Sequence, residues 1–140
     1  MNLRQQLIST ALEWQHRFGV APAITSALSE YDAAMLVGCP EEDYSRYMQD
    51  RTAVSRGADF VHNGTRYQVK ATRPSGKRGS TVTKVPKANN YDWDYLIWIN
   101  YTTDFEIREA WLWHVTDYRN AFETVTRLSP VLMQGGKQLK

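Results

Sequence analysis

The chain has a single cysteine, Cys39, and no long apolar run. One cysteine excludes an intramolecular disulfide and any zinc site built from several thiolates. A lone cysteine is typical of a protein kept in a reducing compartment, so we expect the cytoplasm. No apolar stretch approaches the roughly 20 residues of a membrane-spanning helix, and residues 1–7 lack the apolar core of a signal peptide. We therefore expect no membrane partner.

The chain also has little net charge and few histidines. The formal net charge is +2, from 17 basic and 15 acidic residues. This small excess permits a nucleic-acid partner but does not require one. His16, His62 and His114 are far apart and show no metal-ligand spacing such as His-x-x-x-His. The histidines therefore do not predict a metal centre.

The chain does contain enough apolar material for one folded domain. Its 140 residues are 42% hydrophobic and include five tryptophans and eight tyrosines, which is enough to bury a core. No internal repeat or low-complexity segment divides it. We expect a single domain over residues 1–140, with an N-terminal helix in 1–24, a core over 25–128 and a tail over 129–140. The tail is expected to be either frayed or docked on a partner.

The most informative stretch is residues 57–70, whose pattern predicts a β-hairpin. Asn63-Gly64 is the preferred pair for a two-residue type I′ turn, because both positions need positive φ. Such a turn fixes the pairing register of the two strands. The facing pairs are then His62–Thr65, Val61–Arg66, Phe60–Tyr67 and Asp59–Gln68.

The two faces of this hairpin differ in character, because side chains alternate along a strand. The apolar residues share the face that suits a core: Phe60, Tyr67, Val69 and Ala71. Asp59, Gln68 and Lys70 share the other face. Opposed residues have Cβ atoms roughly 5 Å apart, so oxygens of Asp59 and Gln68 can converge on one Mg²⁺, with Lys70 beside them. The alternative is an ordinary amphipathic hairpin with a solvated polar face.

The rest of the chain predicts helices around further strands. Apolar spacing predicts helices over residues 2–18 and 25–37, and Pro40 with the acids after it predicts a third over about 40–50. A polar link over 51–56 leads to the hairpin. The nearly continuous apolar run 95–101 indicates a strand buried on both faces, and 106–114 is another strand. A last helix is expected over about 118–128, capped by Thr116 or Asp117. This order predicts an α/β (α+β) fold with at least four strands and helices packed on the sheet.

Two acids flank the apolar stripe of the second helix. Glu30 falls about 100° to one side of it and Asp32 about 100° to the other. Helix geometry alone does not choose between them as contributors to a site beside the hairpin. Most acids on helices are exposed carboxylates, which is the alternative for both.

A basic loop follows the hairpin. Residues 72–87 contain two glycines and two prolines, which mark a loop, and no acid. The basic residues in it are Arg73, Lys77, Arg78, Lys84 and Lys87. A basic loop directly after an acid-bearing strand suits a grip on a phosphate backbone. A solvated surface loop is the alternative.

The spacing of Asp59, eight residues and then Gln68-Val69-Lys70 resembles the signature of the PD-(D/E)XK nuclease superfamily, also called restriction-endonuclease-like. The segment from Ser29 to Ala34 resembles the helix that supplies a Glu in that superfamily. The resemblance covers about residues 29–113. The chain carries a Gln-Val-Lys variant, with Gln68 where the pattern has Asp or Glu, and Ala58 where it has Pro.

The resemblance implies a mixed sheet of four or more strands flanked by helices. It implies a metal-dependent endonuclease that hydrolyses DNA phosphodiester bonds in restriction, repair or recombination. Asp59, the Gln68 side-chain oxygen and the Val69 main-chain carbonyl would hold Mg²⁺ or Mn²⁺, and Glu30 would orient a water or help to hold an ion. Lys70 would position the water and stabilise the negative charge of the transition state. Because Gln68 is neutral, the site has one negative charge less than the usual pattern.

Two other interpretations stay open at this point. One is a DNA-binding or assembly module on the same scaffold that cuts weakly or not at all. The other is a protein-interaction subunit whose aromatic strands and Gly135-Gly136 tail bury against a partner. A homodimer is compatible with any enzyme that must act on two DNA strands.

Overall fold

The computed structural model describes residues 1–51 and 57–140, and residues 52–56 of the expected polar link lie outside the described residues. In chain order the elements are α1 (Leu3–Phe18), α2 (Thr25–Leu36), α3 (Glu41–Asp50), β1 (Phe60–His62), β2 (Thr65–Thr72), β3 (Tyr95–Tyr101), β4 (Ile107–His114), α4 (Val115–Phe122), α5 (Pro130–Met133) and β5 (Lys137–Gln138). Over the described ranges the sheet has five strands in the order β1-β2-β3-β4-β5. β2 and β3 are parallel and the other neighbours are antiparallel. This confirms the α/β (α+β) class and a mixed sheet flanked by helices.

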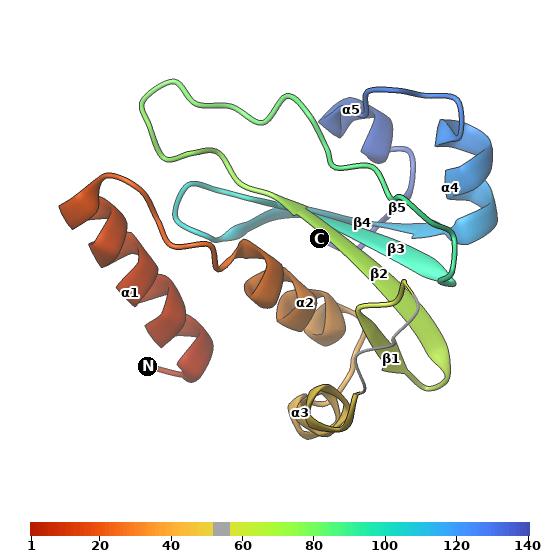
Figure 1. Cartoon of the computed structure of the whole chain (residues 1–140), viewed down its shortest axis with the longest axis horizontal. Helices are drawn as coiled ribbons and strands as arrows, with labels where there is room; N and C mark the ends of the chain where they lie inside the picture. The colour runs from red at the N-terminus through yellow and green to blue at the C-terminus, as the bar shows by residue number, and fades with distance from the viewer. Residues whose placement is uncertain (52–56) are drawn as a thin grey trace.

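Each face of the sheet carries its own apolar core. The core beneath α1, α2 and α3 takes alternate residues of β3, including Ile97 and Ile99. The core beneath α4 and α5 takes the residues between them, Leu96 and Trp98. Figure 1 shows the two groups of helices on opposite sides of the sheet. The prediction that 95–101 is a strand buried on both faces is therefore confirmed.

The hairpin of β1 and β2 has the predicted turn and register. Asn63 and Gly64 both have positive φ, 51° and 76°, as a type I′ turn requires. β1 pairs with residues 65–67 of β2 in the expected register, but the fourth expected pair, Asp59–Gln68, is not formed. Asp59 lies one residue before β1, and its main-chain N–H donates to the Tyr67 carbonyl oxygen at 2.7 Å. The turn therefore fixes where Asp59 lies along β2.

Local signals set the ends of α1. The Asn2 side chain accepts a hydrogen bond from the Gln5 N–H at 2.8 Å, and the Gln5 side chain accepts one from the Asn2 N–H at 3.2 Å. This reciprocal pair is a capping box. Gly19 ends the helix with a φ of 88°, which a glycine adopts without steric cost. No helix in the described part of the chain is both long and apolar enough to cross a membrane.

The last long helix differs from its prediction at both ends. α4 begins at Val115, and its cap is His114, whose Nδ1 accepts from the Thr116 N–H at 3.2 Å. Neither Thr116 nor Asp117 is the cap. The helix ends at Phe122, because the chain beyond it turns to bury Leu128, whose carbonyl oxygen accepts from the Val85 N–H at 3.0 Å. A contact with a distant segment thus shortens the helix.

The expectation of a frayed or partner-bound tail is wrong. Met133 of α5 is fully buried, and β5 pairs with β4. The Ala110 carbonyl oxygen accepts a hydrogen bond from the Leu139 N–H at 2.8 Å. The tail therefore forms an edge strand on the sheet of its own chain.

Candidate active site

A cavity of about 370 Å³ lies between the start of α2 and the part of β2 that β1 does not pair with. Its lining residues from α2 are Thr25, Ser26, Ser29 and Glu30, those from the hairpin are Asp59 and residues 68–71, and the loop contributes Pro86. The cavity thus brings together the residues that the resemblance implies for catalysis: Glu30, Asp59, Gln68 and Lys70.

Asp59 is held against the edge of β2 by its own carboxylate. Its Oδ2 accepts a hydrogen bond from the Val69 main-chain N–H at 2.8 Å. The Arg51 guanidinium donates to the Asp59 main-chain carbonyl oxygen at 2.9 Å. Because the N–H and C=O of a strand residue point to the same side, the Val69 carbonyl oxygen also lies on the Asp59 side of β2. The edge of β2 therefore offers a carbonyl oxygen close to the carboxylate.

The two carboxyl groups in the cavity have raised proton affinities. Burial raises the pKa of Glu30 to about 7, helped by the negative charge of Asp59 and a hydrogen bond between the two side chains. Burial also raises the pKa of Asp59, although the Val69 N–H and the charges of Lys70 and Arg51 pull it down. Near neutral pH the pair therefore tends to keep a proton, and shifted pKa values of this kind mark a candidate functional site.

The donors in the cavity fit a hard divalent cation. They are the carboxylates of Asp59 and Glu30, the Gln68 amide and the Val69 carbonyl, all of which present oxygen atoms. Mg²⁺ prefers oxygen ligands and usually keeps several waters, so it needs only a few protein ligands. Within residues 1–51 and 57–140, no group of three or more His, Cys, Asp or Glu side chains could hold a metal ion. Any ion in this cavity would therefore depend on the amide and carbonyl oxygens.

Asp32, the other acid considered on this helix, belongs to the core instead. It is 4% exposed. Its Oδ1 accepts from Arg4 Nε at 2.6 Å, and its Oδ2 accepts from Arg4 Nη2 at 2.9 Å and from the Tyr101 hydroxyl at 2.7 Å. Burial and the charge of Asp32 raise the pKa of Tyr101, which keeps the hydroxyl protonated as a donor. The structure thus places Glu30, and not Asp32, in the cavity.

Arg73, the first basic residue of the loop, is anchored to its own chain. Its guanidinium lies over the Phe105 ring, 4.0 Å from the ring centroid. It donates to the Thr103 carbonyl oxygen at 3.0 Å and to Gln15 Oε1 at 2.7 Å. Arg73 therefore fixes the base of the loop, a role that its position in the sequence did not reveal.

The other basic residues of the loop fall into two groups. The Lys87 ammonium donates to the carbonyl oxygens of Glu123 and Val125, at 3.1 and 2.8 Å, and so ties the loop to the end of α4. The side chains of the remaining three are exposed: Lys77, Arg78 and Lys84. These three are the loop cations presented to solvent.

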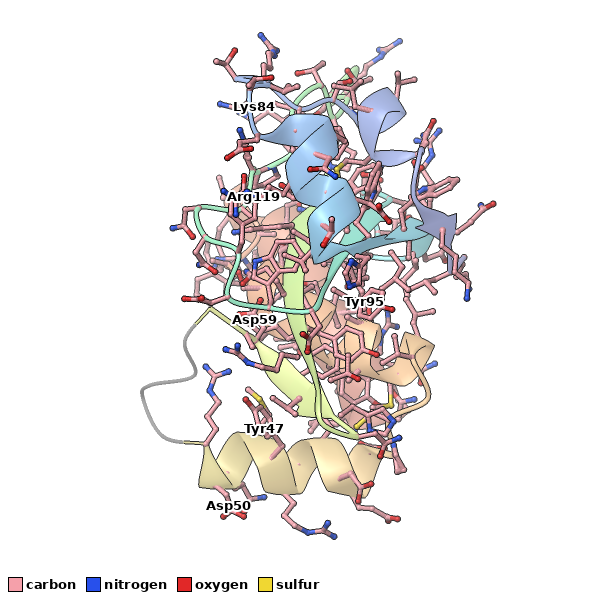
Figure 2. The ribbon with its side chains drawn as sticks, turned by 90° about the vertical axis from the view of Figure 1, so that its right-hand side faces the viewer. Tyr47, Asp50, Asp59, Lys84, Tyr95 and Arg119 are labelled. Atoms are coloured by element: carbon pink, nitrogen blue, oxygen red, sulfur yellow. The ribbon has the colours of Figure 1, made fainter. Side chains whose placement is uncertain are left out.

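A second hollow of about 600 Å³ continues from the cavity along this loop. The two spaces share Thr25 and Ala71. Much of the lining of the second hollow is hydroxyl groups, from Thr72, Ser75, Ser80, Thr81 and Thr83, and Lys84 also contributes. In Figure 2, Asp59 lies near the middle of the view and Lys84 near its upper end, so the hollows lead from the carboxylate to an exposed lysine.

Sequence reasoning missed two residues at the cavity. Arg51 lies in the expected polar link, and its contact with Asp59 depends on how α3 packs beside β1. Ser29 is 3% exposed and donates its hydroxyl to the Ser26 carbonyl oxygen at 3.0 Å. No spacing in the sequence marks either residue, because both positions follow from tertiary packing.

The chain matches no protein-family model and no curated protein. The case for a function therefore depends on the geometry of the cavity and on the resemblance of its residues to a nuclease signature.

Proposed function

We propose that the protein is a metal-dependent DNA endonuclease whose active site is the cavity between α2 and β2. The observation that carries this proposal is that Glu30, Asp59, Gln68 and Lys70 line one cavity. Asp59, Gln68 and Lys70 come from one hairpin, whereas Glu30 comes from α2, about 30 residues earlier in the chain. An ordinary amphipathic hairpin would not need a helix acid beside its polar face.

Asp59, Glu30, the Gln68 amide oxygen and the Val69 carbonyl oxygen would hold Mg²⁺ or Mn²⁺. Such an ion polarises the phosphate and lowers the pKa of a bound water. The chain itself supplies the placement of these oxygens. Asp59 is fixed by the Val69 N–H, and the start of α2 brings Glu30 to the same cavity.

Lys70 and Glu30 would position the attacking water. The Lys70 ammonium would position the attacking water and stabilise the negative charge that grows on the phosphate oxygens. The Glu30 carboxyl has a pKa of about 7 without an ion; a bound cation would favour its charged form, in which it would orient that water.

The hollow beside the loop would carry the DNA backbone toward the cavity. Its hydroxyl groups can donate to phosphate oxygens, and Lys84 and the other exposed cations would supply charge. Because phosphate binding releases counterions, DNA affinity should fall steeply with salt.

The double variant Lys77→Ala/Arg78→Ala should lower the slope of log affinity against log salt concentration by about two. Fluorescence anisotropy at several salt concentrations measures this slope, and an unchanged slope would exclude both residues from the interface.

Cleavage of a labelled duplex in Mg²⁺ or Mn²⁺ tests the proposal. Asp59→Asn and Lys70→Ala should each lower the cleavage rate by about 100-fold or more, while DNA binding persists. Lys137→Ala, which removes an exposed lysine from β5, is the matched control and should cut like the wild type. Cleavage that survives Lys70→Ala, or that proceeds equally in EDTA, would contradict the proposal.

A DNA-binding module that does not cut is the second candidate, and Gln68 is the observation that favours it. A neutral amide gives the cavity one negative charge less than a third acid would. Salt-sensitive DNA binding without cleavage in either metal would support this candidate over the endonuclease.

A further inference from the structure

Exposed apolar side chains are concentrated on α1. Among the described residues, eight large hydrophobic side chains are exposed, and only Val131 and Leu132 lie elsewhere. The six at α1 or directly beside it are Met1, Leu3, Leu7, Trp14, Phe18 and Val20. We call these six residues the α1 stripe.

The face of α1 next to the stripe is firmly attached to the rest of the chain. Ala11 is buried in the first core, and Ile8 and Leu12 pack against it. Arg4 is paired with Asp32, as described above. Figure 1 shows α1 at the outer edge of the molecule, with no element beyond it. The α1 stripe is therefore a surface of the folded chain and not part of its own core.

The four members of the α1 stripe that lie within the helix form one narrow band along it. At about 100° per residue, Leu3, Leu7, Trp14 and Phe18 fall within an arc of about 60°. The rings of Trp14 and Phe18 touch, with centroids 4.7 Å apart. Yet Trp14 is 53% exposed and Phe18 is 62% exposed. A contiguous apolar band of this kind is typical of a surface that binds a partner.

The spacing of the helical members of the α1 stripe is the same from either end of α1. They pair about a point between residues 10 and 11 as Leu3 with Phe18 and Leu7 with Trp14. A twofold interface uses the same patch on both subunits, so the patch must match itself after rotation. We infer that the protein forms a homodimer in which two α1 helices pack antiparallel through the α1 stripe. Leu3 then meets the partner's Phe18, and Leu7 meets the partner's Trp14.

The centre and the rim of the α1 stripe both suit a second copy. Thr10 is the exposed residue at the midpoint, and its small side chain lets two helices approach closely. On the rim, Glu13 and Arg17 form an ion pair within one helix at 3.9 Å, so two copies would not repel. An amphipathic helix that binds a membrane surface usually has a polar face rich in Lys and Arg. The charge-balanced rim of α1 does not fit that pattern.

The interface should be modest in size. At about 1.5 Å per residue, the 16-residue helix is about 24 Å long. A band of that length on one helix buries a small area compared with most specific interfaces. The dimer should therefore dissociate on dilution. None of the residues lining the cavity between α2 and β2 belongs to the α1 stripe, although Val20 also lines the second hollow. Because the proposed catalytic residues all lie in the cavity, this inference and the proposed cleavage can fail independently.

Analytical ultracentrifugation of the full chain from about 1 to 200 μM tests the inference. The wild type should approach twice its 16.2 kDa mass as concentration rises. Leu7→Glu/Trp14→Glu should stay monomeric at every concentration. Val131→Glu/Leu132→Glu, which makes the same change at exposed positions off the stripe, should dimerise like the wild type. Circular dichroism would confirm that both variants fold, and a monomeric wild type at 200 μM would overturn the inference.

Cysteine cross-linking tests the antiparallel register. Leu3→Cys and Phe18→Cys variants should form a disulfide-linked pair when mixed, and neither should cross-link alone; the native Cys39 is buried. A cross-link by Leu3→Cys alone would show a parallel pair and contradict the proposed packing. Flotation with vesicles of phosphatidylcholine and phosphatidylglycerol completes the test. Monomeric protein that floats with them would assign the α1 stripe to a lipid surface and overturn the homodimer.

Discussion

Two carboxylates on α2, Glu30 and Asp32, are two residues apart and have opposite surroundings. Asp32 lies in the core and accepts three hydrogen bonds from Arg4 and Tyr101. Glu30 shares a cavity with Asp59, and burial and that second acid raise its pKa to about 7. One acid thus has donors from its own chain, whereas the other lies beside a second acid.

This difference separates a structural role from a functional one. A buried carboxylate surrounded by donors holds the elements that carry those donors, here α1 and β3. In the half-buried cavity, burial raises the pKa of both carboxyl groups, and Asp59 further disfavours the charged form of Glu30, which does nothing for the fold. Such an arrangement is typical of a binding or catalytic site. The comparison therefore predicts opposite consequences when each acid is removed.

The largest effect is expected for Asp32→Ala. The variant leaves the Arg4 guanidinium and the Tyr101 hydroxyl without their shared partner, so the free energy of unfolding should fall by about 3 kcal/mol. Asp59→Ala should change the free energy of unfolding by less than about 1 kcal/mol, because removing this carboxylate also removes its repulsion of Glu30. Urea unfolding of both variants measures the contrast. Equal losses of stability would remove the distinction between the two acids.

A smaller effect is expected when Gln68 is replaced by the acid that the nuclease pattern has at this position. Gln68→Glu adds a carboxylate to the cavity, so Mg²⁺ or Mn²⁺ should bind about tenfold more tightly, or about 1.4 kcal/mol. Calorimetric titration gives the dissociation constants. Gln138→Glu, at an exposed position on β5, is the control and should leave the affinity unchanged. If Gln68→Glu leaves the dissociation constant for Mg²⁺ or Mn²⁺ unchanged, residue 68 does not contact the ion.

The smallest effect concerns pH. The pKa of Glu30 rises from 4.5 in its ordinary state to about 7 in the folded chain. Its contribution to stability is therefore complete below about pH 4.5 and is lost as the pH rises through 7. Glu30→Gln should match the wild type near pH 4 and exceed it at pH 8 by ~1 kcal/mol, after allowance for partial exposure.

Thermal melts in EDTA at the two pH values measure this difference. Glu42→Gln, at an exposed position in the first turn of α3, is the control and should follow the wild type at both. A Glu30→Gln variant less stable than the wild type at pH 8 would mean that the Glu30 charge supports the fold.

The sequence predicted the parts of the site that depend on local rules. The Asn63-Gly64 turn fixes the pairing of residues 60–62 with 65–67 by backbone sterics alone. It brings Asp59 beside residues 68–70, but the carboxylate binds the Val69 N–H and Asp59 does not pair with Gln68. The choice between Glu30 and Asp32 could not be predicted, because it depends on which side of α2 is covered by α1. Helix periodicity puts both acids beside the apolar stripe and says nothing of the neighbouring helix.

Other differences have the same origin. Arg73 and Lys87 look like their neighbours in the basic loop, but their partners include main-chain carbonyl oxygens that only the folded chain brings near. β5 is two residues long and follows a pair of glycines, so it has no alternation to detect. Its pairing with β4 is a tertiary contact. In each case, long-range packing decides a position that local propensity leaves open.

The central claim is that Glu30, Asp59 and Gln68 together form a site for a divalent cation. Mn²⁺ titration followed by electron paramagnetic resonance of the free ion tests it most directly, with Asp59→Asn and the exposed control Glu42→Gln measured alongside. We predict saturable binding by the wild type and Glu42→Gln, weaker below pH 7 as Glu30 gains its proton, and no binding by Asp59→Asn. Equal binding by Asp59→Asn and the wild type, or none by the wild type, would contradict the account.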